Sequence, residues 1–393
     1  MHARSWLSIL SLPVVGAITY PVLQQPGTPK PAAAKPAAAK PAPQDPLAGM
    51  ADIQDVLGLV QQNYVDAPDM PKVIAGGIQA ALERAHPLNA YLTPEDLRLP
   101  DPGPATAGLV VVKRTIYAQV LAVTPGSPAA KAGIQPGDVI RKVDGDSVGR
   151  LSAWTLERRL RGPVGGAVDL YRYSNTTGDL VKSSLKLELP VAQSEAIRKG
   201  DGGVLVSLPD LDAGRAEALK GLLAPLDRNQ SLVLDLRQCV KGTLDEAAAV
   251  AGLLGAKGTL ATVQESGKPD RTVAVGPASA PFAHVAVLIG RSTLGAPEVL
   301  AACLKKGGAR LLGERTVGLG VERGRFPIRQ GGAVELVYRR WVGAGGEKLD
   351  RQGLTPDQTL KLGEGDDPLT KALDALKTPL PTPVPAPAAH KAA

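Results

Sequence analysis

The spacing of hydrophobic residues changes character twice along the chain, and this divides the folded part into three segments. Between about residues 50 and 98, apolar residues recur every three or four positions, as they do on one face of a helix. This spacing predicts short helices with turns at Pro68 and Pro87. The apolar positions are Ile53, Val56, Leu57 and Val60 in the first stretch and Val73, Ile74, Ile78 and Leu82 in the second.

The second segment, from about residue 106 to residue 189, is built from short β-like stretches. They read GLVVVK, AQVLAVT, DVIRKVDG and AVDLYRY, with Gly and Pro between them. Two other stretches predict helices, a short one in PGSPAAKAGIQPGD and a longer one in LSAWTLERRLRG. Strands and two helices in so short a segment predict a small, partly open β-barrel.

In the third segment, from about residue 202 to residue 362, strands alternate with helices. The runs LVLDL and VAVLI are continuously apolar, as in central strands that are covered on both faces. Alternation of this kind predicts an α/β domain with right-handed βαβ crossovers. The fold class expected for the whole chain is therefore a multidomain protein, α/β plus mainly-β, with a helical segment in front.

The first 25 residues have the layout of a secretory signal. Arg4 is followed by an apolar run over residues 6–23. Pro13 and Pro21 weaken this run as a membrane-spanning helix, and no clean cleavage site of small residues follows it. An uncleaved membrane anchor is therefore an alternative to a cleaved signal peptide.

Pro-rich segments flank the folded part. Residues 26–49 contain a PAAAK repeat, and residues 377–393 have the same character. Such sequences cannot bury a core and act as semi-rigid spacers. We expect a signal or anchor (1–25), a spacer (26–49), a helical segment (50–103), a mainly-β domain (104–190), an α/β domain (200–365) and a tail (377–393). This order predicts an exported protein, either periplasmic or membrane-anchored and facing the periplasmic or extracellular side.

Composition excludes several classes of protein. Aromatic residues make up only 3% of the 393 residues, too few for a surface on which nucleic-acid bases stack. Two Cys and four His cannot build a disulfide framework or a zinc-finger array, and no metal-ligand spacing or phosphate loop occurs. Part of the net charge of +7 lies on Lys30, Lys35 and Lys40 of the spacer. We therefore expect no metal, no cofactor and no nucleic-acid partner.

Motifs in all three segments resemble the C-terminal processing peptidases, also called tail-specific proteases. They are NYVD at 63–66, HPLNAYLTPED at 86–96, PGSPAAKAGIQPGDVIRKVDGDSV at 125–148, LVLDLR at 232–237, GERTVG at 313–318 and GLTPD at 353–357. The resemblance implies that residues 104–190 form a PDZ domain. It also implies that residues 200–365 form the peptidase-like α/β domain of that family.

The resemblance implies a peptide-binding groove in the PDZ domain. Such a domain captures an unstructured C-terminus as an added strand, and backbone N–H groups of a loop hold its carboxylate. The alternative is that Gly108 is only a turn glycine and Leu109 only a core residue. The groove is implied to lie between the loop at 107–110 and the helix at 152–160. The positions implied to bind peptide are Ala107, Gly108, Leu109, Val110, Trp154 and Leu156.

The catalytic positions of the family are substituted in this chain. The family uses a serine nucleophile, a lysine base that desolvation keeps neutral and a glutamine that orients the lysine. The matching positions hold Gly295, Leu319 and Arg323. In the glycine-rich turn that helps to form the oxyanion hole, only Gly242 is kept. Because a nucleophile and its base act as a unit, these changes predict that the serine–lysine mechanism is lost.

Other side chains nearby are candidate substitutes for the missing groups. They are Ser292, Cys239 and Lys241, although a buried structural thiol and an exposed turn lysine are the plainer interpretations of the last two. Cys239 and Cys303 would form a disulfide in an oxidising compartment only if their geometry allowed it. His284 begins its strand and is therefore expected at the end of the sheet opposite Cys239.

Three functions remain open at this point. The first is an exported, inactive relative that binds C-terminal or unstructured protein segments as a scaffold, adaptor or decoy. The second is an active serine endopeptidase that cleaves near C-termini with a rearranged site. The third is a structural role for the α/β domain alone. Membrane attachment through residues 1–25 and oligomer formation also remain open.

Overall fold

The computed structural model describes residues 48–190, 194–363 and 365–378. Contacts within the chain divide it after Val65 into two compact units. The described part of the first unit contains helix α1 (Met50–Asn63), in which no side chain is buried. The helix expected from the apolar spacing is therefore confirmed, and residues such as Ile53 and Val56 lie exposed on it.

The second unit begins with the rest of the helical segment. Asp69 caps helix α2 (Met70–Ala85) by accepting a hydrogen bond from the Lys72 N–H. A capping box between Thr93 and Asp96 starts helix α3 (Pro94–Arg98). Between these helices, strand β1 (Ala90–Leu92) pairs with a strand of the α/β domain, so the segment is anchored to the C-terminal half of the chain.

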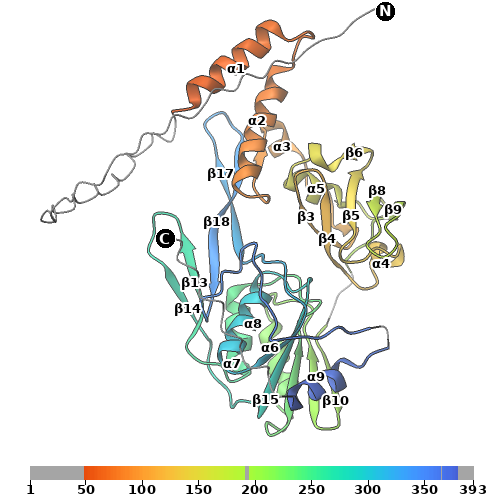
Figure 1. Cartoon of the computed structure of the whole chain (residues 1–393), viewed down its shortest axis with the longest axis vertical. Coiled ribbons are helices and arrows are strands. Elements are labelled where there is room, and N and C mark those ends of the chain that lie inside the picture. The colour runs from red at the N-terminus through yellow and green to blue at the C-terminus, as the bar shows by residue number, and fades with distance from the viewer. Residues whose placement is uncertain (1–47, 191–193, 364, 379–393) are drawn as a thin grey trace, which may run out of the picture. The chain divides into compact units, whose positions relative to one another are not determined.

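The mainly-β domain is an antiparallel sheet that does not close into a barrel (Figure 1). The strand order is β3-β4-β5-β8-β9, which leaves β3 at one edge. The predicted strands and both helices are confirmed, and β9 is a further strand that the sequence pattern did not single out. Short strand pairings add to this domain: β2 (Ala105–Thr106) pairs with β7 (Arg161–Gly162), and β6 (Asp146–Ser147) pairs with β5. The main elements are β3 (Leu109–Lys113), β4 (Ala118–Val123), α4 (Pro128–Lys131), β5 (Val139–Val143), α5 (Ala153–Arg159), β8 (Ala167–Tyr173) and β9 (Leu180–Lys186).

The α/β domain is built on a sheet of order β10-β11-β12-β15-β16-β19. All neighbours in it are parallel except the antiparallel edge pair of β10 and β11. The apolar runs LVLDL and VAVLI form β12 and β15 in its centre, as predicted. The strands are β10 (Ala196–Gly200), β11 (Gly203–Ser207), β12 (Ser231–Asp235), β15 (His284–Ile289), β16 (Arg310–Gly313) and β19 (Gln358–Thr359).

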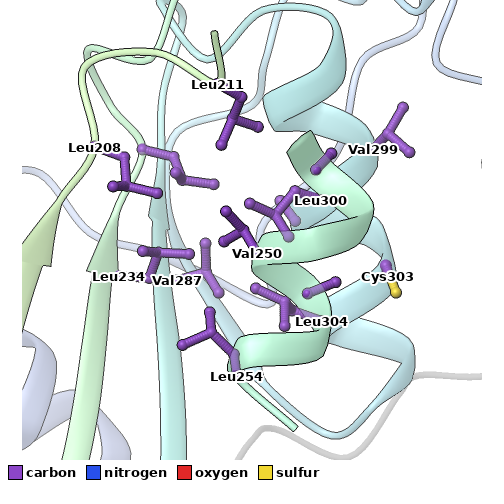
Figure 2. Close-up of a cluster of buried hydrophobic side chains, with 14 of the residues drawn as sticks. Leu208, Leu211, Leu234, Val250, Leu254, Val287, Val299, Leu300, Cys303 and Leu304 are labelled. Carbon is purple, nitrogen blue, oxygen red and sulfur yellow. The ribbon is translucent and has the colours of Figure 1, made fainter. Parts of the chain in front are cut away.

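Both faces of this sheet are covered. On one face, α6 (Arg215–Leu223), α7 (Leu244–Leu253) and α8 (Ala296–Lys306) form the main core (Figure 2), in which Leu234 of β12 packs in one cluster with Val250 and Leu300. On the other face, Val233 packs in a second cluster with Leu369 of α9 (Pro368–Lys377). Because successive strand residues point to opposite faces, a two-sided core requires continuously apolar strands.

A second sheet holds the long hairpin visible in Figure 1. Its order is β1-β18-β13-β14, and β17 also pairs with β18. The sequence pattern did not predict these strands. Their bounds are β13 (Thr259–Glu265), β14 (Arg271–Ala274), β17 (Val321–Pro327) and β18 (Ala333–Gly343).

A buried polar pair fastens the helical segment to the end of the α/β domain. His86 Nε2 lies 3.2 Å from Asp350 Oδ1, and both residues are buried. Arg340 also donates a hydrogen bond to the Asp350 carboxylate. Burial raises the pKa of Asp350, but the hydrogen bond to His86 and the charges of Arg340 and Arg351 outweigh it, so the pKa lies below its usual value.

This shift predicts a loss of stability in acid. The folded-state pKa of Asp350 is lower than its unfolded value of about 4. Its contribution to the free energy of unfolding is therefore complete above the unfolded value, and it is lost as the pH falls through the folded-state pKa. We expect Asp350→Asn to flatten the fall in the free energy of unfolding below about pH 4, measured by urea unfolding at several pH values. Asp179→Asn, at an exposed position, is the matched control. An unchanged slope in Asp350→Asn would contradict the assignment.

Candidate functional site

The turn between β15 and α8 has a backbone shape that is rare outside glycine. Gly295 precedes the first residue of α8 with φ 73° and ψ −121°. A positive φ of this size strains residues that carry a Cβ, which explains why glycine is accommodated here without cost. In α/β-hydrolases, a sharp strand-to-helix turn of this kind exposes the nucleophile.

The carboxylate of Glu298 joins this turn to a second loop. Glu298 lies in the first turn of α8 and is fully buried. Its Oε2 accepts hydrogen bonds from the N–H groups of Gly295 at 2.9 Å and Leu319 at 2.8 Å. Its Oε1 accepts from the Gly318 N–H at 2.9 Å and from the Thr316 hydroxyl. One carboxylate thus fixes the loop at 316–319 against the start of α8.

Four hydrogen-bonding groups converge on the Glu298 carboxyl group. The Thr316 hydroxyl accepts from the Leu354 N–H at 2.7 Å, so its own proton is free to go to Glu298. All four partners of the carboxylate are therefore donors. Burial raises the pKa of Glu298 above its usual value, and the four hydrogen bonds oppose that shift without cancelling it.

The structure brings two of the three predicted catalytic positions together. A Cβ added at Gly295 would lie 3.6 Å from the carbonyl oxygen of Leu319 and 3.8 Å from the ring of Trp341. These are ordinary contact distances, so the space at Gly295 would accept a small side chain. Trp341, on β18, was not singled out by the sequence because an isolated tryptophan carries no motif.

The third position, Arg323, is engaged elsewhere. It lies on β17, and its guanidinium donates to both carboxylate oxygens of Glu157 on α5, at 3.1 Å and 3.2 Å. It also lies 3.9 Å from Glu335 on β18. Arg323 therefore forms an ion-pair contact between the hairpin and the helix of the mainly-β domain.

The turn that follows β12 lies beside Leu294. The Leu294 N–H donates to the carbonyl oxygen of Cys239 at 3.1 Å. Gly242 adopts φ 153°, and a Cβ there would come within 2.3 Å of Leu211, so packing alone requires this glycine. Lys241 is exposed and pairs with Asp212.

The two candidate substitutes for a nucleophile, Ser292 and Cys239, are both buried. The Ser292 hydroxyl is buried and donates to the carbonyl oxygen of Leu121 at 2.7 Å. Cys239 and Cys303 are both buried and free, so the conditional disulfide is not formed. Burial raises the pKa of the Cys239 thiol well above its usual value, which disfavours the reactive thiolate. His284 begins β15, whereas Gly295 follows the end of that strand.

An apolar cluster, called here the interdomain cluster, lies beside these loops. Its buried members are Val112 of β3, Leu121 of β4 and Leu294. Leu319 packs against it and is half-buried. The sheet of the mainly-β domain therefore contacts the loops that carry Leu294 and Leu319. The remaining members are Leu88, Val110, Val240 and Val317.

Comparison with known proteins places both domains in families. The peptidase family S41 model matches residues 204–360, and a PDZ domain model matches residues 119–170. The chain contains a PDZ domain and a peptidase family S41 domain. The resemblance noted from the motifs, and the fold class expected from the sequence pattern, are thereby confirmed.

Two curated relatives and one solved structure illustrate the match. A probable CtpA-like serine protease of Staphylococcus aureus (strain MSSA476) is 26% identical over 80% of this chain and 65% of its own length. The chloroplastic carboxyl-terminal-processing peptidase 2 of Arabidopsis thaliana is 30% identical over 75% of this chain and 56% of its own. The chain thus spans less than two thirds of either. The photosystem II D1 C-terminal processing protease has the same fold, with a TM-score of 0.63 at 22% identity over 80% of this chain and 93% of that one.

The loop implied to hold a peptide carboxylate lies at the start of edge strand β3 of the PDZ domain. Gly108 has φ 75°, and a Cβ there would come within 2.1 Å of Ser127, so a packing reason for this glycine exists independently of peptide binding. The Ala107 N–H donates to the carbonyl oxygen of Leu160, and the Gly108 N–H donates to the Thr106 hydroxyl. Two N–H groups of the loop thus already have acceptors.

The other positions implied to bind peptide have different surroundings. Leu156 is fully buried in the PDZ core, where Leu109 also packs. Val110 packs against the interdomain cluster instead. Trp154 is half-buried, and the Arg158 guanidinium lies 4.8 Å from the centre of its ring. A peptide groove at these positions stays a prediction.

The structure describes residues 48–190, 194–363 and 365–378. Within these ranges, no three or more His, Cys, Asp and Glu side chains gather where they would hold a metal ion. No helix in them has the length and hydropathy needed to cross a membrane. The signal or anchor expected over residues 1–25, nearly all of the spacer and most of the tail lie outside these ranges.

Glu298 should matter for folding independently of any catalysis. Glu298→Ala would leave the N–H groups of Gly295, Gly318 and Leu319 without their acceptor in a mostly buried place. We expect the free energy of unfolding to fall by about 3 kcal/mol or more, measured by urea unfolding. Glu314→Ala, at an exposed position nearby, should change it by less than about 0.5 kcal/mol. Equal effects of the two substitutions would contradict this role.

Proposed function

We propose that this protein is an exported, catalytically inactive relative of the tail-specific serine proteases. In this proposal it binds C-terminal or extended peptides through its PDZ domain and serves as a scaffold or adaptor. The observation that carries the proposal is the pair of Gly295 and Leu319, which lie side by side where the family motif has a serine and a lysine.

The chemistry of the two side chains supports inactivity. Acyl transfer by this family needs a hydroxyl that attacks and a neutral amine that takes its proton. A glycine and a leucine supply neither group. The nearby Ser292 hydroxyl donates to a backbone carbonyl group, and the Cys239 thiol is buried.

The topology of the PDZ domain supports peptide binding. In the sheet order of the described residues, β3 has a strand partner on one side only, β4. An edge strand offers unpaired backbone groups to an extended peptide. Helix α5 packs against β3 and supplies the second wall of the expected groove.

The second candidate is an active endopeptidase that cleaves near C-termini. Two observations favour it: the names of the curated relatives and the positive-φ turn at Gly295, which has the backbone shape of a nucleophile-bearing turn. This candidate requires a nucleophile and a base from other residues of the site.

Digestion assays separate the two candidates. We expect purified protein to leave casein and a substrate with an apolar, unstructured tail intact, because Gly295 and Leu319 supply neither a nucleophile nor a proton acceptor. Gel electrophoresis and mass spectrometry of the products provide the measurement. Cleavage that disappears in Ser292→Ala or Cys239→Ala would overturn inactivity.

A triple variant tests whether the domain keeps the shape of a peptidase. Gly295→Ser, Leu319→Lys and Arg323→Gln together restore the residue types of the family motif. We expect this variant to cleave the tailed substrate, and the same variant with Gly295→Ala in place of Gly295→Ser to leave it intact. This pair of results would show that the backbone of the domain still has the shape of a peptidase.

Peptide binding is tested separately. We expect fluorescein-labelled peptides with apolar C-terminal residues to bind, and amidation of their carboxyl group to weaken binding by about tenfold because a charge-assisted hydrogen bond is lost. Fluorescence polarisation measures both affinities. Equal binding of free and amidated peptides would argue against the carboxylate loop.

Export is the remaining part of the proposal. It is supported by the sequence pattern of residues 1–25 and the spacer that follows. Cell fractionation of the full chain and of a chain lacking residues 1–25 tests it. Retention of both in the cytoplasm would contradict it.

A further inference from the structure

A pocket of about 320 Å³ lies where the PDZ domain meets the S41 domain. Leu121 of β4 and Val317 of the S41 domain line it, and both belong to the interdomain cluster. None of the described residues that line it is acidic. Four of them are arginines from three separate loops and the end of β3: Arg114, Arg291, Arg315 and Arg351. This pocket is called the arginine pocket below.

The charges of these arginines are only weakly neutralised by the protein. Among the described residues, the Arg114 guanidinium group has no hydrogen bond or ion pair. The Arg315 guanidinium group donates to the Gln352 carbonyl group, which is a neutral acceptor. Arg291 Nε lies 3.9 Å from a carboxylate oxygen of Glu314, and Arg351 Nε lies 3.8 Å from one of Asp350. Both distances are longer than a hydrogen bond. Positive groups gathered in this way attract an anion.

The walls of the pocket are fixed before any ligand arrives. Arg351 has φ 57°, an unusual backbone conformation for a residue with a side chain, and its N–H donates to the Gly318 carbonyl group at 2.9 Å. Thr316, another lining residue, is held by Glu298 and Leu354. A preorganised site loses less entropy on binding.

We propose that the arginine pocket binds the carboxylates of an acidic segment in the peptide that the PDZ domain holds. The proposal rests on the proposed function. A peptide whose C-terminus lies at Gly108 and which pairs with β3 must run antiparallel to it, toward Lys113 and Arg114. Strand β3 has five residues. At about 3.4 Å per residue, the peptide therefore passes the end of β3 about five residues before its own C-terminus.

The side-chain chemistry favours carboxylates on a peptide over nucleic acid. The planar guanidinium group of arginine matches a carboxylate with two parallel hydrogen bonds, and clusters of arginine recognise acidic motifs. A nucleic-acid site would also need aromatic side chains on which bases stack. None of the described residues that line the pocket is aromatic.

Fluorescence polarisation with a matched peptide pair tests the proposal on the full chain. One labelled peptide has an apolar C-terminus and three glutamates starting about five residues upstream, and the other has glutamines in their place. We expect the acidic peptide to bind about tenfold more tightly at low salt, and the difference to shrink as salt is added.

Variants assign the effect to the pocket. Arg114→Gln combined with Arg351→Gln should remove the preference for the acidic peptide and leave the affinity for the neutral peptide unchanged. Arg271→Gln, at an exposed arginine on β14 outside the pocket, should leave the preference intact. Circular dichroism confirms that each variant is folded.

The outcomes separate this proposal from the proposed function. Binding of both peptides with equal affinity would overturn the arginine pocket as an acidic-peptide site and leave the proposed function standing. Failure of both peptides to bind would overturn both. Binding of a single-stranded oligonucleotide that competes with the acidic peptide and is lost in the double variant would overturn peptide specificity in favour of a general polyanion site.

Discussion

The buried carboxylate of Glu298 is the constraint on which the candidate site depends. It accepts four hydrogen bonds, three from backbone N–H groups and one from the Thr316 hydroxyl. These hydrogen bonds hold the turn at Gly295 against the loop that carries Leu319. A buried charge is tolerable only when its acceptor positions are filled in this way. The proximity of Gly295 and Leu319 is therefore a property of the folded scaffold, whatever side chains stand at the two positions.

The scaffold of the site is therefore separate from the side chains at positions 295 and 319. The hydrogen bonds that shape the site are made by backbone N–H groups, by the Thr316 hydroxyl and by the Glu298 carboxylate, and none of them uses the side chain of Leu319. Hydrogen bonds to Glu298 and the packing of α8 hold the positive-φ turn at Gly295 in place. Selection on folding alone would preserve these features.

Much of the fold could be predicted from the sequence where the pattern is local. The runs LVLDL and VAVLI identified the central strands because a two-sided core requires apolar residues at every position. The hairpin of β17 and β18 escaped prediction because charged residues such as Arg323 and Glu335 interrupt any alternation and pair with distant partners. The role of Glu298 escaped for the same reason: hydrogen-bond partners 18 to 21 residues away leave no local signal.

Leu319 packs against apolar side chains at the position where the resemblance implies a lysine. A lysine base must be desolvated to be neutral, and the surroundings of Leu319, beside Val112 and Leu121, are of that desolvating kind. Burial of a lysine amine at this place would lower the free energy of unfolding, because the amine loses its hydration. A leucine at the same place instead gains about 1.5–3 kcal/mol if it becomes fully buried, and about half of that when half-buried. It thereby strengthens the contact between the PDZ and S41 domains, because it packs against the buried side chains of Val112, Leu121 and Leu294.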